Sequence, residues 1–245
     1  MLKLASEQIF NLTDAKITAG FSSRLYNNMS LAYGDTRCSL ENRKNFLNNL
    51  GIDYRSLVCA KQIHLGNVRY TTEEDKGRGA LTYGTAIEAT DAFITDKKNV
   101  PLAIFTADCL SVFLYDPKKP AIGLVHAGWR SSKEGILAST IKLMHKLFDT
   151  KVSNLHVGFG PAIRSCCCEV TGDFTDFFPK EVSHRDAGFY LDLVKVNKRQ
   201  AQESGVKEAN ITDSQVCTFC NNHEFFSFRK EGKSCGRLIS VIMLK

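Results

Sequence analysis

Residues 101–130 read PLAIFTADCLSVFLYDPKKPAIGLVHAGWR, and this stretch decides the fold. Leu102–Thr106 and Leu110–Tyr115 are apolar runs rich in residues that favour strands, and Ala121–Val125 is a third such run. Residues 116–120 are Asp-Pro-Lys-Lys-Pro, which is typical of a turn. The pattern predicts a hairpin of two buried strands, preceded by a further buried strand.

The register of this hairpin brings two reactive side chains together. If the turn is centred on Lys118, Cys109 lies opposite Ala127 and beside His126. We therefore expect a thiol and an imidazole to become neighbours where the two strands end.

Two helices are predicted after the hairpin. Ser131 and Glu134 have the spacing of a capping box at a helix start, and apolar residues then recur every three or four positions as far as Phe148. A second helix is expected over about Asp192–Ser204, with Gly205 as its left-handed stop. The histidine that closes the hairpin should thus lie between a strand end and a helix start.

The C-terminal residues 225–244 are predicted to form a strand, a turn rich in Lys and Gly, and a final strand. Arg229, Lys230, Lys233 and Arg237 gather around that turn. A solvated basic face is the first interpretation of this cluster, and phosphate binding is the alternative.

The chain as a whole predicts one α+β domain over residues 1–245, a layered α/β sandwich. It is 43% apolar and 24% charged, values typical of globular proteins, and it contains no repeat and no linker of biased composition. No segment is long and apolar enough to predict a membrane span. The glycines of 158–161 lack the spacing of a dinucleotide-binding loop, so we expect no such cofactor.

Charge and cysteine usage limit the partners and the compartment. The net charge of +6 favours small anionic ligands, and without a long basic run it predicts neither a nucleic-acid partner nor a membrane partner. The opening residues do not resemble a signal peptide, and nine cysteines without an export signal indicate a reducing compartment. We expect a cytoplasmic monomer or small homo-oligomer.

Three residues are candidate ligands of a catalytic metal ion. Zinc in such sites takes three nitrogen or sulfur ligands and leaves one position open, and His64, Cys109 and His126 meet that need. Taken one at a time, each is more often an ordinary structural residue. Their predicted adjacency, together with the neighbouring Asp108, makes a functional site an equally good interpretation.

The remaining cysteines favour structural roles. Cys166, Cys167 and Cys168 are adjacent, so on an extended backbone they cannot all face one ion, and core packing is expected. Cys217 and Cys220, with His223 nearby in sequence, resemble half of a zinc knuckle, but no second pair at a suitable spacing completes it. A structural turn is the default interpretation.

Six blocks occur in a fixed order: KQIHLGNV, TDAFIT, PLAIFTADCLSVFLYDP, AIGLVHAGWRSSKEGIL, VGFGPAIRSCCCEV and CTFCNNHEFFSFRKEGKSCGR. In content and order they resemble the laccase-domain (YfiH-type) proteins, from GFSSR near residue 20 to the last strand. That family carries the label multicopper polyphenol oxidase-like and is regarded as purine nucleoside phosphorylases that also deaminate adenosine. The resemblance implies a sandwich of the cytotoxic-necrotising-factor-like type with mixed β-sheets.

The resemblance also implies roles for individual residues. It assigns zinc to His64, Cys109 and His126, and it makes Asn42 and Arg43 of the ENR block candidate substrate-binding residues, the arginine as a substrate or phosphate contact. Two positions depart from the family pattern. Ala32 stands where relatives usually have an asparagine, and Cys168 replaces a tyrosine, so substrate preference is open.

The leading hypothesis is a zinc-dependent purine nucleoside phosphorylase with adenosine deaminase activity. Its partners would be inorganic phosphate and a purine nucleoside such as adenosine, inosine, guanosine or methylthioadenosine. Arg43 and Arg229 would offset the phosphate charge, and Asp108 would orient or move a proton.

Two other enzymatic hypotheses stay open. In one, Cys109 is a nucleophile activated by His126, giving a hydrolase or deamidase that acts on a cell-wall precursor or another amide. The other is a copper-dependent polyphenol oxidase, to which six scattered histidines are poorly suited. A non-catalytic interaction module has the least support.

Overall fold

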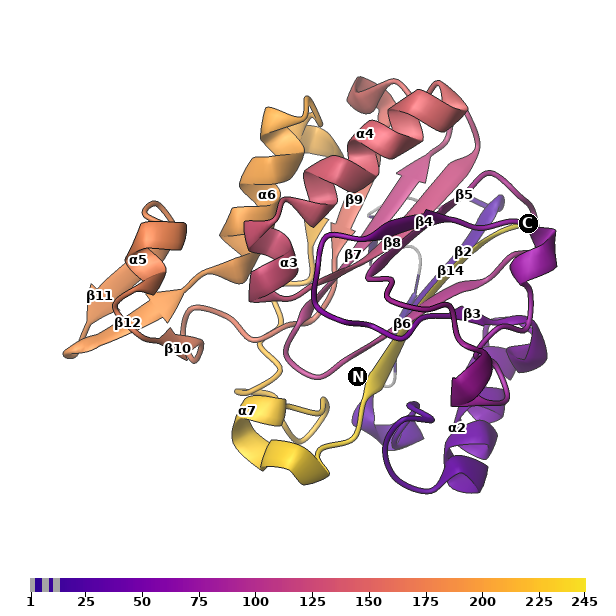
Figure 1. Cartoon of the computed structure of the whole chain (residues 1–245), viewed down its shortest axis with the longest axis horizontal. Coiled ribbons are helices and arrows are strands. Elements are labelled where there is room, and N and C mark those ends of the chain that lie inside the picture. The colour runs from indigo at the N-terminus through magenta and orange to yellow at the C-terminus, as the bar shows by residue number, and fades with distance from the viewer. Residues whose placement is uncertain (1–2, 6–8, 11–13) are drawn as a thin grey trace.

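Two β-sheets packed face to face form the centre of the protein (Figure 1). The computed structural model describes residues 3–5, 9–10 and 14–245. The six-stranded sheet has the order β13-β9-β7-β8-β5-β4, the five-stranded sheet the order β1-β2-β14-β6-β3, and a small sheet the order β10-β12-β11. The strands are β1 Lys3–Ala5, β2 Ile17–Ser22, β3 Val58–Cys59, β4 Val68–Tyr70, β5 Ala92–Thr95, β6 Leu102–Thr106, β7 Leu110–Asp116, β8 Ala121–Ala127, β9 His156–Phe159, β10 Glu169–Val170, β11 Val182–Arg185, β12 Gly188–Leu191, β13 Ile211–Asp213 and β14 Leu238–Leu244.

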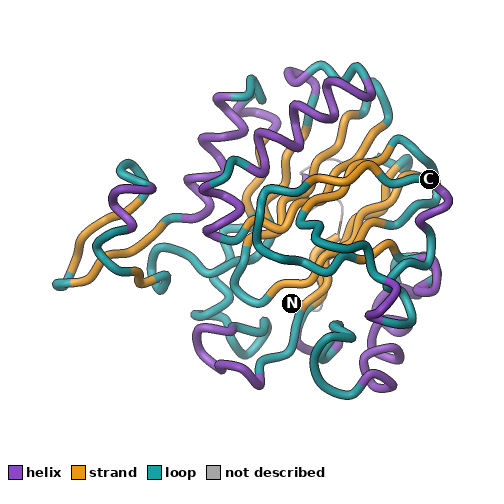
Figure 2. The backbone as a smooth tube through the Cα atoms, in the orientation of Figure 1, coloured by secondary structure: helices purple, strands orange, loops and turns teal. Residues whose placement is uncertain are grey.

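Helices cover the outer faces of the two large sheets (Figures 1 and 2). The α-helices are α2 Thr36–Asn48, α3 Trp129–Lys133, α4 Ile136–Phe148, α5 Phe174–Phe177, α6 Leu193–Glu203 and α7 Phe228–Glu231. The 3-10 helices are η1 Arg24–Tyr26, η2 Tyr54–Ser56, η3 Glu73–Asp75, η4 Tyr83–Thr85, η5 Val152–Asn154, η6 Glu208–Asn210 and η7 Gly232–Ser234. No helix among the described residues is both long and apolar enough to cross a bilayer.

The strands of the hairpin are buried on both faces, which explains their continuous apolar runs. Successive side chains of a strand point to opposite faces. In β7, Phe113 and Tyr115 pack toward the five-stranded sheet, whereas Val112 and Leu114 pack on the side of α4 and α6. Helix α2 covers the far face of the five-stranded sheet through residues such as Phe46.

The resulting order of layers is helix, sheet, sheet, helix. Most strand pairs are antiparallel, while β13 with β9, β3 with β6 and β4 with β5 are parallel. The prediction of a layered α/β sandwich with mixed sheets is confirmed.

The predicted hairpin is present, but its register differs by one residue. Asp116 pairs with Ala121 and Leu110 with Ala127, so Cys109 lies one step beyond the last pair. The reason is the turn: the Asp116 carboxylate accepts the amide hydrogens of Lys118 and Lys119 at 2.9 and 3.1 Å and closes a four-residue loop.

The helix after β8 begins differently from the capping-box prediction. Gly128 is the N-cap of α3, and the Ser131 hydroxyl, inside the first turn, accepts the Gly128 amide hydrogen at 3.0 Å. Gly135, at φ +74°, separates α3 from α4. Glu134 instead accepts the amide hydrogen of Gly66 at 2.7 Å. The predicted second helix is confirmed as α6, with Asp192 as N-cap and Gly205 at φ +101°.

The predicted C-terminal hairpin is wrong in its first strand. Strand β14 is present, but Ser227 leads into α7 instead of a strand. The Glu231 carboxylate accepts the Ser227 amide hydrogen at 2.9 Å and closes this helical turn. Side-chain capping thus replaces ladder pairing in this segment.

The turn between β6 and β7 links the two large sheets, because β6 belongs to the five-stranded sheet and β7 to the six-stranded one. The crossing is made by Ala107, Asp108 and Cys109, and Asp108 adopts φ +86°. This left-handed backbone is uncommon for a residue other than glycine. The cysteine singled out in the sequence therefore lies where the sheets separate.

Candidate metal centre and its cavity

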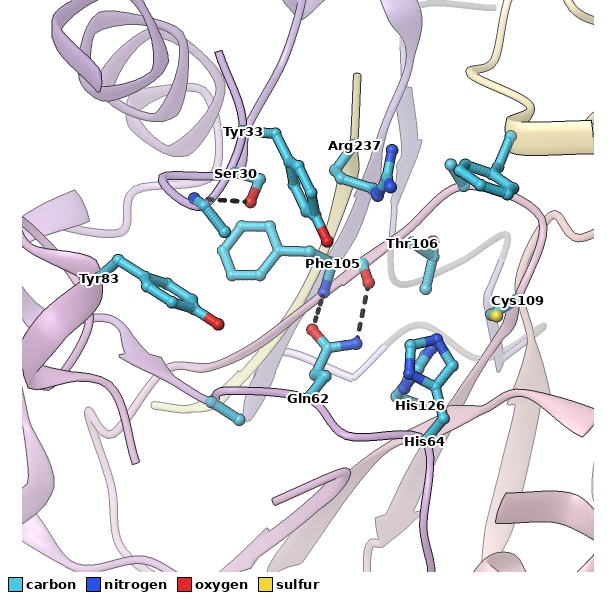
Figure 3. Close-up of a pocket in the computed structure, with 14 residues that line it drawn as sticks. Ser30, Tyr33, Gln62, His64, Tyr83, Phe105, Thr106, Cys109, His126 and Arg237 are labelled. Carbon is cyan, nitrogen blue, oxygen red and sulfur yellow. Dashed lines mark hydrogen bonds between the residues drawn. The ribbon is translucent and has the colours of Figure 1, made fainter. Parts of the chain in front are cut away.

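His64, Cys109 and His126 converge although they come from three separate segments (Figure 3). His126 lies near the end of β8, Cys109 in the turn between the sheets, and His64 in the loop before β4. One potential ligand atom from each lies within 4.8 Å of the others, and the two imidazole centroids are 4.6 Å apart. A Cβ at Gly128 would stand 3.2 Å from the His64 ring and 3.3 Å from the Cys109 sulfur, so glycine permits this close approach.

Asp91 holds two of these three segments together, and it was not among the residues predicted for the site. Its carboxylate is buried and lies 2.8 Å from Nδ1 of His126. It also accepts the amide hydrogens of Ile63, His64 and Leu65 at 3.2, 2.9 and 3.0 Å. With Nδ1 donating to this carboxylate, Nε2 of His126 is left as the ligand atom. An acidic residue directly before the buried strand β5 was the signal in the sequence.

The loop that carries His64 has two further attachments. Gln62 forms a pair of hydrogen bonds with the backbone of Phe105 in β6, at 2.8 and 2.9 Å (Figure 3). Glu134 holds the other side of the loop through Gly66. His64 has φ 61°, a strained value for this residue type that these contacts support.

The charges of Cys109 and His126 stabilise each other. Burial raises the pKa of the Cys109 thiol, but the facing imidazoles of His126 and His64 outweigh burial and lower this pKa to about 6. Burial lowers the pKa of His126, yet Cys109 and Asp91 outweigh it and raise this pKa to about 9. Cys109 is therefore poised as a thiolate, the form that binds metals and attacks electrophiles.

The donor set fits zinc. One thiolate and two imidazoles are the soft and borderline ligands that zinc takes in catalytic sites, and a cavity on one side leaves room for a fourth ligand. The three side chains would hold such an ion at the boundary between protein and cavity.

The cavity next to the three side chains has a volume of about 300 Å³, at the small end of the range for small-molecule sites. His64, Cys109 and His126 form one end of its wall. Its other lining residues are Ser30, Ala32, Tyr33, Ala60, Gln62, Tyr83, Phe105, Thr106, Ala107, Phe228 and Arg237.

Aromatic rings and one arginine form the wall facing the three side chains. The rings of Tyr83, Phe105 and Tyr33 lie near one another in the view, with Phe105 between the two tyrosines (Figure 3). The Arg237 guanidinium lies over the ring of Tyr33, 4.4 Å from its centroid, and 5.6 Å from that of Phe228. Among the described residues lining this cavity, Arg237 is the one Lys or Arg. An apolar ring system and an anion are the ligand features that such a wall accommodates.

Asp108 and Arg229 lie beside the three side chains but face another cavity, of about 380 Å³. The Asp108 carboxylate accepts the hydroxyl hydrogen of Thr218 at 2.6 Å and the amide hydrogen of Arg229 at 2.7 Å. The Arg229 guanidinium donates to the carbonyl of Glu169 at 2.8 Å. Cys109 lines both cavities, so these residues adjoin the site from behind.

The position of Arg43 corrects the expectation of a ligand contact. Its guanidinium is buried and donates to the carbonyls of Met29, Gly79 and Ala80 at 2.7 to 3.0 Å. Arg43 supports the segments around the cavity and does not line it. Asn42 donates to the carbonyl of Asn28 at 2.9 Å and faces an adjoining open hollow that shares Ala32 and Tyr33 with the cavity.

Residues 15–245 match the family described as multi-copper polyphenol oxidoreductase laccase. The chain belongs to this family. Among curated relatives of the laccase family, purine nucleoside phosphorylase YlmD of Geobacillus stearothermophilus is 32% identical over 225 residues, which cover 88% of this chain and 82% of that one. Adenosine deaminase RL5 from an unknown prokaryotic organism is 28% identical and covers 84% and 82% of the two chains.

A solved structure of the laccase family has the same fold. The crystal structure of YfiH, a hypothetical protein from Bacillus licheniformis, superposes with a TM-score of 0.89 at 30% identity and covers 94% of this chain and 93% of that one. The family resemblance found in the sequence is thus confirmed. Relatives named as enzymes support an enzymatic role for this member.

Proposed function

We propose that this chain is a zinc-dependent purine nucleoside phosphorylase that also deaminates adenosine. The observation that carries the proposal is the convergence of His64, Cys109 and His126 at one end of a cavity whose opposite wall is aromatic and bears Arg237. Relatives named purine nucleoside phosphorylase and adenosine deaminase support the same reaction classes.

Each part of the cavity has a task in this proposal. The rings of Tyr33, Tyr83 and Phe105 stack against the purine, which presents an apolar face. Arg237 offsets the charge of phosphate as it approaches C1′ of the ribose. Asp91 fixes the orientation of His126. Zinc, when bound, supplies a positive charge that orients an anion or lowers the pKa of water.

In this proposal phosphate and water are alternative nucleophiles in the same cavity. Phosphate attack at C1′ gives free base and ribose 1-phosphate, whereas hydroxide attack at C6 of adenosine gives inosine and ammonia. Asp108, behind Cys109, has both carboxylate oxygens engaged by Thr218 and Arg229, so we assign it the positioning of the Cys109 turn.

The decisive experiment follows products from adenosine with and without phosphate, using protein of measured metal content. We expect adenine only when phosphate is present, inosine without it, and loss of both activities after chelation with recovery on adding zinc. Full turnover by metal-free protein would rule out the proposal.

A Cys-His hydrolase or deamidase is the second candidate function. It is favoured by the linked Cys109, His126 and Asp91, which form a nucleophile, a base and an orienting carboxylate. Cys109→Ala separates the two functions: loss of metal together with activity supports the metal enzyme, whereas loss of activity with full metal content supports the nucleophile. Cys38→Ser, an exposed thiol on α2, is the matched control.

Copper-dependent phenol oxidation has less support from the site. A multicopper centre needs several clustered histidines. Among the described residues, only His64 and His126 belong to a candidate ligand group.

A further inference from the structure

Four cysteines that the proposed function does not use lie close together in two loops. Cys166 and Cys167 come from the loop after β9, and Cys217 and Cys220 from the loop after β13. Their four sulfur atoms all lie within 4.8 Å of one another. The Cys220 sulfur is 3.7 Å from that of Cys166 and 3.3 Å from that of Cys167.

This spacing matches a tetrahedral zinc site. With zinc–sulfur bonds of about 2.3 Å, the edges of a sulfur tetrahedron measure about 3.8 Å. A disulfide would instead need two sulfurs at about 2.05 Å and would leave the other two thiols out. Cys220 has two neighbours at comparable distance, which is the arrangement of a shared ligand sphere.

The local backbone makes this convergence possible and corrects two expectations from the sequence. The amides of Cys167 and Cys168 both donate to the Arg164 carbonyl, at 2.9 and 2.8 Å, so these cysteines lie on a tight turn and not on an extended strand. Cys168 alone of the three is buried in the core. The turn directs Cys166 and Cys167 toward the loop that carries Cys217 and Cys220. Cys166 and Cys167 are therefore the second pair of ligands that the Cys217-x-x-Cys220 half-site lacked.

Positive side chains surround the four cysteines. Arg164, Arg185 and Lys230 donate to the carbonyls of residues 216, 165 and 219 at 3.2, 2.6 and 3.5 Å. Each of these carbonyls belongs to a residue adjacent in sequence to one of the four cysteines. A zinc ion with four thiolates carries a net charge of −2. Arg164 is already paired with the Asp213 carboxylate at 2.6 and 2.8 Å, so Arg185 and Lys230 are the two cations that offset this charge.

We propose that Cys166, Cys167, Cys217 and Cys220 bind one zinc ion in a closed structural site, separate from the ligand set of His64, Cys109 and His126. Its place in the fold gives it a positioning role. Thr218, between two of the ligands, donates to the Asp108 carboxylate, and Ile163 donates to the Asp108 carbonyl at 2.9 Å. The ion fixes the two loops that hold the turn of Cys109.

The test is the zinc content of purified full-length protein, measured by mass spectrometry of the metal. The wild type should hold two zinc ions per chain. The triple variant His64→Ala, Cys109→Ala, His126→Ala should keep one, and its cobalt-substituted form should show the absorption of tetrahedral thiolate coordination. Cys217→Ser with Cys220→Ser should lose one ion, whereas Cys38→Ser should keep both.

Three results would overturn the proposal. One is a triple variant that binds no zinc although all its thiols are free. Another is a protein mass two hydrogens lower than the sequence requires, with two thiols fewer than the number of cysteines, because that result means a disulfide. The third is iron in place of zinc. If the Cys217 and Cys220 double variant does not fold, the triple variant still decides. Because these readouts require no activity, the result is independent of the proposed function.

Discussion

Asp91 connects two of the proposed metal ligands through its carboxylate. Its carboxylate engages His126 and three consecutive amides of the His64 loop. Asp91→Asn removes the charge and leaves one acceptor oxygen. We predict that zinc affinity falls by about 10- to 100-fold, as measured by competition with a chelating dye.

The control for this prediction is Asp96→Asn at the other end of β5, where the carboxylate accepts the Tyr70 hydroxyl hydrogen at 2.8 Å. Asp96→Asn should leave zinc affinity unchanged. Equal affinity in the wild type and Asp91→Asn would show that the carboxylate does not orient a ligand.

Arg237 is the second residue whose role can be tested by a single substitution. Because it is the cation of the cavity wall, Arg237→Ala should raise the KM for phosphate by about 10-fold or more and leave phosphate-independent deamination of adenosine much less affected. Steady-state kinetics of both reactions measure this. Arg229→Ala is the comparison, since Arg229 lines the cavity behind Cys109. A larger KM change in Arg229→Ala would move the phosphate site there.

Among the secondary-structure elements, α7 owes its geometry to Glu231, which accepts from Arg24, Asn222 and the Ser227 amide at 2.5, 2.7 and 2.9 Å. Burial raises the pKa of Glu231, but Arg24 and the Ser227 amide outweigh it and lower the pKa to about 2. The folded pKa lies below the ordinary value of 4.5, so this stabilisation is present above pH 4.5 and is lost as the pH falls toward 2.

We therefore predict that Glu231→Gln lowers the free energy of unfolding at pH 7 by at most about 3 kcal/mol. The difference from the wild type should shrink as the pH falls from 4.5 toward 2, because in this range the carboxylate binds a proton more readily in the unfolded chain than in the folded one. Urea unfolding at several pH values measures both proteins. A difference that stays constant with pH would contradict this role of the carboxylate.

The elements predicted from the sequence are those set by apolar periodicity. The strands of the central hairpin and helices α4 and α6 were predictable because burial on one or two faces leaves a regular pattern. What escaped prediction depends on single polar side chains: Asp116 shifts the hairpin register, Ser131 joins the helix it was expected to cap, and Glu231 turns a predicted strand into α7.

In the candidate site, too, some residues were predictable from the sequence and others depended on single polar contacts. His64, Cys109 and His126 were found as residue types that bind metals, and the structure brings them together. Asp91 was missed because its partners are mostly backbone amides, which a sequence does not identify, so that its place directly before a buried strand was the one available signal. Arg43 was expected to contact a ligand, and the structure shows its guanidinium donating to buried carbonyls, a difference that a sequence motif does not reveal.

Across the whole molecule, Arg43 ties α2 to distant segments. It donates to Met29 on one side and to Gly79 and Ala80 on the other, and it stacks over Phe105 of β6 at 4.7 Å. Lysine cannot reach three carbonyls, so Arg43→Lys should cost about 2 kcal/mol or more. We predict a fall in Tm of about 4–8 °C with an unchanged KM for phosphate.

Calorimetry and kinetics together check this prediction. Lys44→Arg, the next position on α2 and an exposed side chain, is the control and should change neither quantity. A raised KM for phosphate at an unchanged Tm would restore Arg43 as a ligand contact.

The loop anchored by Asp91 also bears on which ion the protein carries. Three main-chain bonds shape this loop before any cation arrives, so the entropy of ordering it is lost during folding and not during metal uptake. A site that is preorganised in this way distinguishes poorly between ions of similar size. Copper has a higher intrinsic affinity than zinc for nitrogen and sulfur donors. The ion bound by His64, Cys109 and His126 then depends on which ions are available. Protein produced in copper-rich medium would bind copper through these three side chains.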